Sequence, residues 1–194
     1  MQRSAYTTLA ACVALSFSSV ACAKVSAPVA VTVPTVSTNI TEADVLAAQQ
    51  AWGNALVKIA TDYDEGGIAK AKATAEAVLD AAYGYNMGAV LFKPTLTVAP
   101  QTFRPTKEGA LAYFVGNNPK FPNDKGFALK GWRSFSVTNS AIQLHGNTAM
   151  SIGNVSVTDK AGKTTTVDKT WGYVRDDQGN LRIVLHHSSL PYQP

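Results

Sequence analysis

Five strand-forming runs follow residue 128 of this 194-residue chain, and they restrict its fold more than any other feature. The runs are rich in Val, Ile, Thr and aromatic residues, as β-strands are. Turn signals such as His145-Gly146-Asn147 separate them. We expect an antiparallel meander because such short connections join antiparallel neighbours. The predicted strands span residues 129–138, 141–145, 148–158, 164–175 and 181–188.

Helical patterns precede the strands. Thr41 can cap a first helix, and Glu42 and Asp44 suit the positive end of its dipole. One apolar stripe follows at spacings of three, four and seven residues, formed by Val45, Trp52, Leu56, Ile59 and Tyr63. Gly66-Gly67 is expected to end this helix, and residues 68–83 predict a second one.

The middle of the chain predicts a strand, a short helix and a loop. Residues 89–98 predict a strand that is bent at Pro94. Thr106 is expected to cap a third helix over residues 107–115, and residues 117–126 predict a loop. Helices followed by a run of strands indicate an α+β fold, in which a curved antiparallel sheet wraps around the first helix. A cone-shaped cavity between helices and sheet would then suit a small ligand.

Residues 1–23 resemble a secretory signal peptide. Arg3 supplies the positive end, an apolar stretch spans residues 9–20, and Ala21-Cys22-Ala23 fits the small-x-small cleavage rule. The preceding Ser19 and Val20 leave a lipoprotein signal as an alternative. We expect residues 24–40 to be a linker, residues 41–194 to be the functional domain, and the mature protein to be periplasmic or secreted.

Composition excludes several classes of function. Both cysteines, Cys12 and Cys22, lie in the predicted leader, so the mature chain offers no disulfide and no thiolate. The chain has 17 Lys and Arg against 13 Asp and Glu, without the clustered basic face that nucleic-acid binding requires. No apolar run reaches the roughly 20 residues that span a bilayer. There is also no G-x-S-x-G elbow, P-loop or G-x-G-x-x-G motif.

The histidines argue against a three-histidine metal centre. His186 and His187 are adjacent on a predicted strand, so their side chains point to opposite faces and cannot converge with His145 on one ion. His186 and Ser188 are two residues apart and share a face, which makes a compact donor and acceptor pair. A structural pair of buried polar residues is the simpler interpretation of these two positions from composition alone.

Three segments of the chain carry recognisable motifs. Residues 183–191 carry an H-H-S-S-x-P signature, residues 90–95 read VLFKPT, and residues 112–116 read AYFVG. These segments resemble the iota-class carbonic anhydrases. With Trp52 and the strands that hold Trp132 and Trp171, the likeness covers about residues 41–191. Those enzymes have a domain like the association domain of calcium/calmodulin-dependent kinase II, within the nuclear-transport-factor-2-like (NTF2-like) superfamily, and the expected order of elements fits that fold.

The resemblance implies reversible hydration of carbon dioxide to bicarbonate in a pocket of hydroxyl and imidazole groups. It places Thr95, Tyr113, His186 and Ser188 in the catalytic site. We expect no cofactor, although other members are associated with zinc or manganese. His186 is the expected proton relay, because an ordinary imidazole titrates near neutral pH.

Two alternatives remain open. The first is a non-catalytic NTF2-like domain for oligomerisation or small-ligand binding, since one fold hosts many functions. The second is a cyclase or isomerase of the same superfamily, which usually needs an Asp or Glu in the cone, where the sequence places none.

We also expect a homodimer. On the last strand, Ile183, Leu185 and His187 are predicted to project away from the cavity. No helix remains to cover that face, so a second copy related by a two-fold axis is the simplest cover.

Overall fold

The computed structural model describes residues 38–193, so the predicted signal peptide and most of the predicted linker lie outside the described residues. The described residues begin just before helix α1, Glu42–Ala82. Thr41 caps it through a capping box: the Thr41 backbone N donates to Asp44 Oδ2 (2.8 Å), and the Asp44 backbone N donates to Thr41 Oγ1 (3.2 Å). Ile40 is buried and its backbone N donates to Gly146 O (2.7 Å). Part of the predicted linker, residue 40, therefore already packs against the fold.

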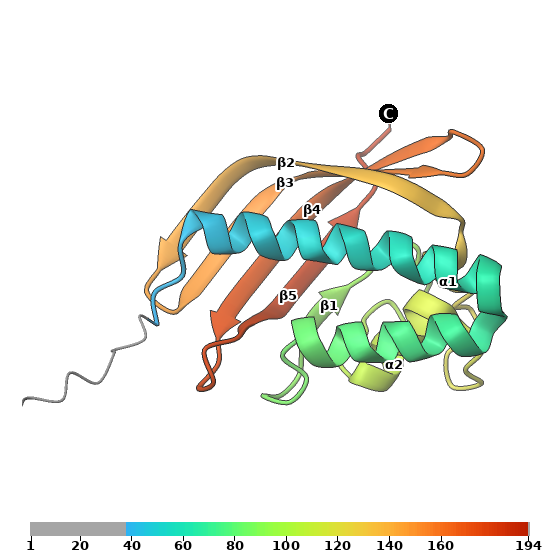
Figure 1. The fold of residues 1–194 in the computed structure, drawn as a ribbon, viewed down its shortest axis with the longest axis horizontal. Helices are drawn as coiled ribbons and strands as arrows, with labels where there is room; N and C mark the ends of the chain where they lie inside the picture. Colours follow the sequence, from blue (N-terminus) through green and yellow to red (C-terminus); the bar gives the residue numbers. More distant parts are fainter. Residues whose placement is uncertain (1–37, 194) are drawn as a thin grey trace, which may run out of the picture. The chain divides into compact units, whose positions relative to one another are not determined.

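The two predicted long helices are present as the two halves of α1. Gly67 has φ 66° and ψ −162°, a conformation that is open almost only to glycine, and the chain reverses there. The first half lies across the sheet, and the second half runs back beside β1 and α2 (Figure 1). The prediction that Gly66-Gly67 ends the first helix is confirmed.

Five strands form one sheet in the order β1-β5-β4-β3-β2. The short strand β1, Leu91–Lys93, occupies one edge. The other four are β2 (Trp132–His145), β3 (Thr148–Asp159), β4 (Thr164–Arg175) and β5 (Leu181–Ser189). They form the predicted antiparallel meander. The α+β class with helices on a curved antiparallel sheet is confirmed (Figure 1).

Three strand predictions are wrong in detail. The strand expected over residues 89–98 is only three residues long, and it pairs with β5 in parallel. The runs 129–138 and 141–145 form one strand, β2, which begins at Trp132 after a 3-10 helix, η1 (Phe127–Leu129). A register shift between Asn139 and Ala141 marks a bulge where we expected a break.

The third error concerns the faces of β5. Ile183 is buried in the core rather than projecting away from the cavity, because the β4–β5 register shifts between Gly172 and Tyr173. This bulge changes the alternation of side chains, so that Ile183 and His186 both point inward, whereas Leu185 is partly exposed and His187 is exposed.

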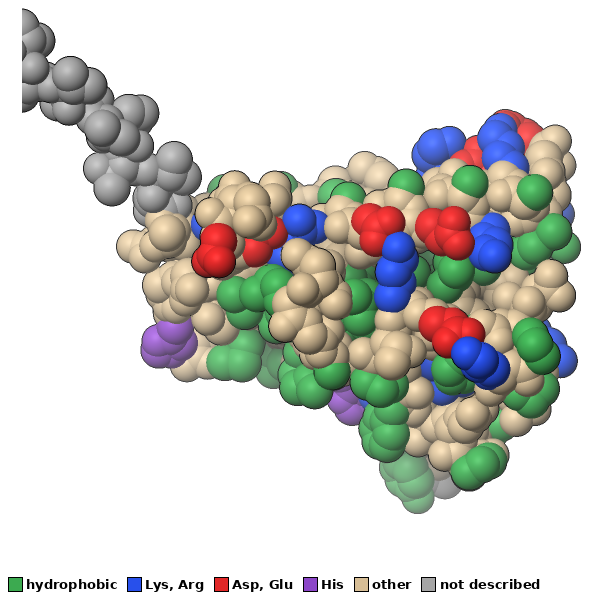
Figure 2. All heavy atoms as spheres, turned by 90° about the horizontal axis from the view of Figure 1, so that it is seen from below, with side chains coloured by type: hydrophobic (Ala, Val, Ile, Leu, Met, Phe, Trp, Pro, Cys, Tyr) green, Lys and Arg blue, Asp and Glu red, His purple; other side chains and the backbone are tan. Residues whose placement is uncertain are grey.

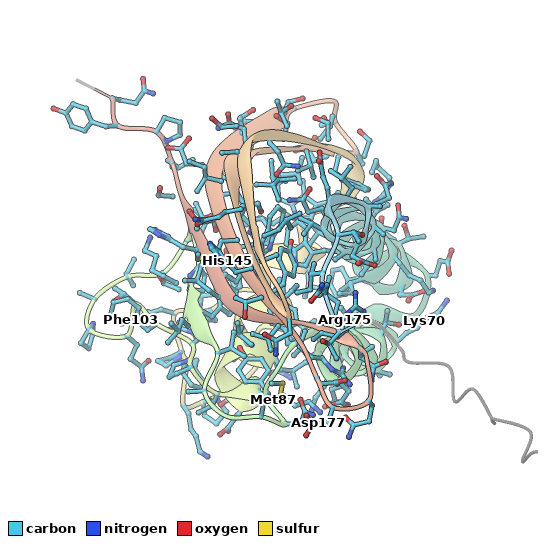
Figure 3. The ribbon with its side chains drawn as sticks, turned by 90° about the vertical axis from the view of Figure 1, so that its left-hand side faces the viewer. Lys70, Met87, Phe103, His145, Arg175 and Asp177 are labelled. Carbon is cyan, nitrogen blue, oxygen red and sulfur yellow. The ribbon has the colours of Figure 1, made fainter. Side chains whose placement is uncertain are left out.

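Helix α2, Lys107–Val115, is capped by Thr106 as predicted, since the Gly109 backbone N donates to Thr106 Oγ1 (3.2 Å). The loop between β1 and α2 carries Phe103 at the surface (Figure 3). This loop is anchored by a buried ion pair, in which Arg104 Nε and Nη2 donate to the two carboxylate oxygens of Asp124 at 2.8 and 2.7 Å.

The core lies between α1 and the inner face of the sheet. Gly53 lets the helix approach the sheet closely, because a Cβ at that position would lie 2.1 Å from the Phe135 ring. At the start of α1, Arg175 Nη2 donates to Asp44 Oδ2 (2.8 Å) and ties β4 to the helix (Figure 3).

Lys and Arg side chains are interspersed with Asp and Glu on the face of the molecule in Figure 2. No helix of residues 38–193 is long and apolar enough to cross a membrane.

Candidate active site

A cavity of about 450 Å³ opens between the inner face of the sheet, α2 and the first half of α1. Its walls are largely apolar and aromatic. They include Trp52, Leu96, Phe114, Phe127, Trp132, Val155, Val157 and Val167. A cavity of this size and lining can admit a small uncharged molecule and hold it away from bulk water.

The four residues expected in the site all line this cavity: Thr95, Tyr113, His186 and Ser188. They come from the loop after β1, from α2 and from β5. Thr95 Oγ1 donates to Ser188 Oγ at 2.7 Å, and Ser188 is 4% exposed. Because the Ser188 oxygen accepts from Thr95, its own proton is left to donate to another group.

Tyr113 supplies a second hydroxyl. Burial raises the pKa of this phenol, while hydrogen bonding to the Leu96 backbone and to Thr95 acts in the opposite direction. The hydroxyl therefore stays protonated at neutral pH and can donate. The Tyr113 ring packs edge-on against Phe92 and parallel to Phe127, with centroids 5.7 and 5.5 Å away, which fixes its orientation.

His186 is buried and both of its ring nitrogens have partners. Nδ1 lies 2.8 Å from the Tyr83 hydroxyl, and Nε2 contacts Lys169 Nζ. Burial lowers the pKa of His186 well below its ordinary value, and the neighbouring Lys169 and His187 act in the same direction. We expected His186 to relay protons near neutral pH because an ordinary imidazole titrates there. With its pKa lowered by burial, His186 no longer meets that condition.

Sequence reasoning missed Lys169 on β4. This lysine is 5% exposed, lines the cavity and is the register partner of Ser188. Its Nζ lies 4.5 and 4.9 Å from the ring centroids of Trp52 and Trp171. The signal was available in the sequence, because Lys169 alternates with Val167 and Trp171 at the spacing of one strand face.

An acidic residue also lines the cavity, contrary to the expectation that the sequence places none there. Asp159 ends β3, and its Oδ1 accepts from the backbone N of Ala161 (2.9 Å) and of Lys163 (3.0 Å). These contacts use one carboxylate oxygen to hold the turn between β3 and β4.

The donor set does not fit a zinc or manganese centre. Residues 38–193 contain no group of three or more His, Cys, Asp or Glu that could hold a metal ion. In the cavity, both nitrogens of His186 are engaged by protein groups. His145 ends β2 and His187 is exposed, and neither lines the cavity.

Comparisons with known proteins identify the family of the chain. A family model described as metal-independent carbonic anhydrase matches residues 43–190. The chain belongs to this family. A metal-independent carbonic anhydrase from Nostoc sp. (strain PCC 7120) is 59% identical over 170 residues, which cover 88% of this chain and 83% of that protein.

The chain is also similar to solved structures. The crystal structure of the iota-carbonic anhydrase from a cyanobacterium, complexed with bicarbonate, is 61% identical with a TM-score of 0.82, and the match covers 84% of this chain and 99% of that one. A putative calcium/calmodulin-dependent protein kinase II association domain from Xanthomonas campestris is 22% identical with a TM-score of 0.49, over 80% and 91% of the two chains. The family model and the two relatives at 59 and 61% identity make the protein an iota-class carbonic anhydrase, as the sequence signature indicated.

Proposed function

We propose that this carbonic anhydrase hydrates carbon dioxide reversibly in the cavity lined by Thr95, Tyr113 and Ser188. The observation that carries this proposal is the Thr95–Ser188 hydrogen bond of 2.7 Å at the wall of an apolar cavity. This bond orients the Ser188 hydroxyl as a donor. The bicarbonate that is bound in the cyanobacterial relative supports the same ligand here.

The apolar walls suit carbon dioxide, and the hydroxyl groups suit the charge that develops on it. When a water oxygen attacks the carbon, one carbon–oxygen π pair moves onto an oxygen atom. Fixed donors that point to this oxygen stabilise the transition state because they do not have to reorient during the reaction. Ser188 and Tyr113 line the cavity with protonated hydroxyls that suit this role, and Thr95 positions Ser188.

A carbon dioxide hydration assay on the purified protein tests this function. We expect a stopped-flow rate above the buffer background, unchanged after exhaustive treatment with a chelator. A rate that is lost on chelation and restored by zinc or manganese would contradict the metal-free site. No rate above background in the folded protein would favour a non-catalytic binding or assembly domain.

We further propose that the protein is a homodimer, joined through an apolar patch on the outer sheet face. The patch comprises Leu91, Met150, Ile152 and Leu185. Met150, Gly172 and Leu185 are register partners across β3, β4 and β5, and Leu91 continues the row on β1. Leu91, Met150 and Ile152 are 65, 44 and 51% exposed, and contiguous exposed apolar surface of this kind marks contact sites.

Light scattering of the purified protein at micromolar concentration tests the dimer. Leu185→Arg and Ile152→Arg should each shift the mass toward that of a monomer, because they would bury an unpaired charge. Leu46→Arg replaces another exposed leucine, on α1 and outside the patch, and should leave the mass unchanged. A monomeric wild-type protein would refute the interface without affecting the cavity.

Residues 1–23 are proposed to direct export to the periplasm or beyond. Deletion of residues 2–23 should leave the protein in the cytoplasm. Mass spectrometry of the exported protein should find cleavage after Ala23. Lipid attached to Cys22 would instead identify a lipoprotein, and an uncleaved full-length chain in the cytosol would refute the signal.

A further inference from the structure

The hydrogen bonds around His186 determine which of its nitrogens carries the proton. Trp52 Nε1 can only donate, and it donates to the Tyr83 hydroxyl oxygen at 3.0 Å. The phenolic proton then needs an acceptor, and among residues 38–193 the one within reach is His186 Nδ1, 2.8 Å away. Tyr83 is 1% exposed, so an unpaired hydroxyl proton there would be costly.

This assignment leaves the proton of the neutral imidazole on Nε2, which contacts Lys169 Nζ. An N–H group needs an acceptor, and an ammonium group has none to offer, whereas an uncharged amine has one lone pair. The chain of hydrogen bonds from Trp52 through Tyr83 and His186 is therefore complete only when Lys169 is an uncharged amine.

The surroundings of Lys169 agree with this state. None of the ion pairs within residues 38–193 includes Lys169. Burial lowers the pKa of the lysine well below its ordinary value. The titratable groups that share its cavity are Tyr113 from α2, Lys130 before β2, Asp159 and Lys163 at the β3–β4 turn and His186 on β5, and His187 on β5 also interacts with its charge.

We propose that Lys169 is the general base of the reaction, with His186 and Tyr83 as positioning residues that keep its amine uncharged in the empty cavity. The inference rests on the proposed function, since the amine acts on the water that attacks carbon dioxide. Lys169 lines the same cavity as Ser188 and is its neighbour across the β4–β5 ladder.

The proton step balances without a further reactant. The water oxygen forms a bond with the carbon of carbon dioxide, one π pair moves onto a carbon dioxide oxygen, and one water O–H bond breaks. The proton of the water passes to the lone pair of the Lys169 amine. The hydrogen bond from His186 Nε2–H to this lone pair must break first. The products are bicarbonate and a Lys169 ammonium, which then releases its proton to solvent buffer.

The site can hold both forms of the lysine. The faces of Trp52 and Trp171 stabilise a cation through their ring quadrupoles, and bicarbonate supplies the opposite charge. Once bicarbonate leaves, the ammonium faces the Nε2–H of His186 without an anion, and it returns to the amine. The lysine is thus neutral before the reaction and charged only beside the product.

NMR of the lysine ε-methylene groups tests this cycle directly. In protein labelled with ¹³C-lysine, the signal assigned to Lys169 by its loss in Lys169→Met should have the shift of an amine at pH 8. Saturating sodium bicarbonate should move it to the ammonium position, while the exposed Lys72 stays an ammonium throughout. An ammonium in the free protein, or an amine in the bicarbonate complex, would overturn the proposal.

Kinetics give the second test. Lys169→Met should lower kcat for hydration by about 10² to 10⁴, the usual contribution of a general base. Lys72→Met, an exposed lysine on α1, is the control and should keep full activity. The wild-type rate should fall as the pH falls through the pKa of Lys169, because only the amine accepts a proton, and this acid limb should be absent from the residual rate of Lys169→Met.

A failure of the proposed function and a failure of the general-base proposal give different results. An inactive wild-type protein refutes the proposed function, whereas an active Lys169→Met protein with an unchanged acid limb refutes the base and leaves the function in place. If Lys169→Met does not fold, the wild-type spectrum still decides, because Lys169 is the only buried lysine among residues 38–193. An amine signal at pH 8 is then assigned to it, and the absence of any such signal refutes the proposal.

Discussion

Asp124→Asn should destabilise the protein strongly, because it removes the charge that neutralises a fully buried guanidinium. The side chains of Arg104 and Asp124 are 2 and 1% exposed, and two hydrogen bonds join them. Arg104 Nη1 also donates to the backbone oxygens of Gln101 (2.7 Å) and Phe103 (2.9 Å), which hold it in place but carry no full charge. Breaking such a buried pair by removing one partner costs about 3–5 kcal/mol.

Urea denaturation monitored by circular dichroism measures this cost. With a slope of about 2 kcal/mol per M urea, the midpoint should fall by roughly 1.5–2.5 M. The matched control is Glu76→Gln, which breaks the exposed Lys72–Glu76 pair, whose charged atoms are 3.9 Å apart. That change should cost less than about 1 kcal/mol.

A double variant distinguishes the effect of an unpaired buried charge from the effect of altered packing at the Arg104–Asp124 pair. Arg104→Met with Asp124→Leu removes both charges and keeps apolar volume, so it should be more stable than Asp124→Asn alone. The reasoning would be refuted if Asp124→Asn lowered the midpoint no more than Glu76→Gln, or if the double variant were the less stable of the two.

Three further outcomes are expected. Ser188→Ala and Tyr113→Phe should each lower hydration turnover by roughly ten- to a thousandfold in stopped-flow assays, with little change in stability, because each removes one donor; wild-type turnover in both would refute the site. Gly67→Ala should cost about 1–3 kcal/mol in urea denaturation, since its backbone conformation suits only glycine, and should leave turnover unchanged. Between the lowered pKa of Lys169 and its ordinary value near 10.5, the unfolded chain binds a proton that the folded protein does not, so wild-type stability should rise with pH across that window. Urea titrations at several pH values should show a flatter rise for Lys169→Met, and an identical slope would contradict a neutral lysine in the fold.

Local sequence signals were sufficient to predict most of the helices and strands. Threonine caps, the glycine pair at residues 66–67 and the turn motifs between strands act within a few residues, so the sequence could reveal the helices and the meander. The bulges could not be predicted in this way. Thr138-Asn139-Ser140 has the composition of a turn, yet Asn139 exchanges two hydrogen bonds of 2.8 Å with Gln49, which lies ninety residues earlier on α1.

The site was predicted to the extent that a motif marked it. Thr95, Tyr113, His186 and Ser188 lie in the segments that resemble the family, and all four line the cavity. Lys169 lies outside the three motif segments. Its alternation with Val167 and Trp171 places it on one strand face, but a lysine on a strand is ordinarily assigned to a solvated face. Its burial depends on Trp52 and Trp171, which come from different elements, and no local pattern shows that they meet.

The parallel pairing of β1 with β5 has a consequence for the order of folding. Phe92 is the register partner of His186, so the ladder joins residues that are 94 positions apart in the chain. Contacts between such distant residues form late, since the chain between them must first be ordered. During synthesis, β1 has no strand to pair with until β5 has left the ribosome. The loop that carries Thr95 therefore meets Ser188 only in the finished chain, and a polypeptide truncated before β5 lacks His186 and Ser188, two of the four predicted site residues.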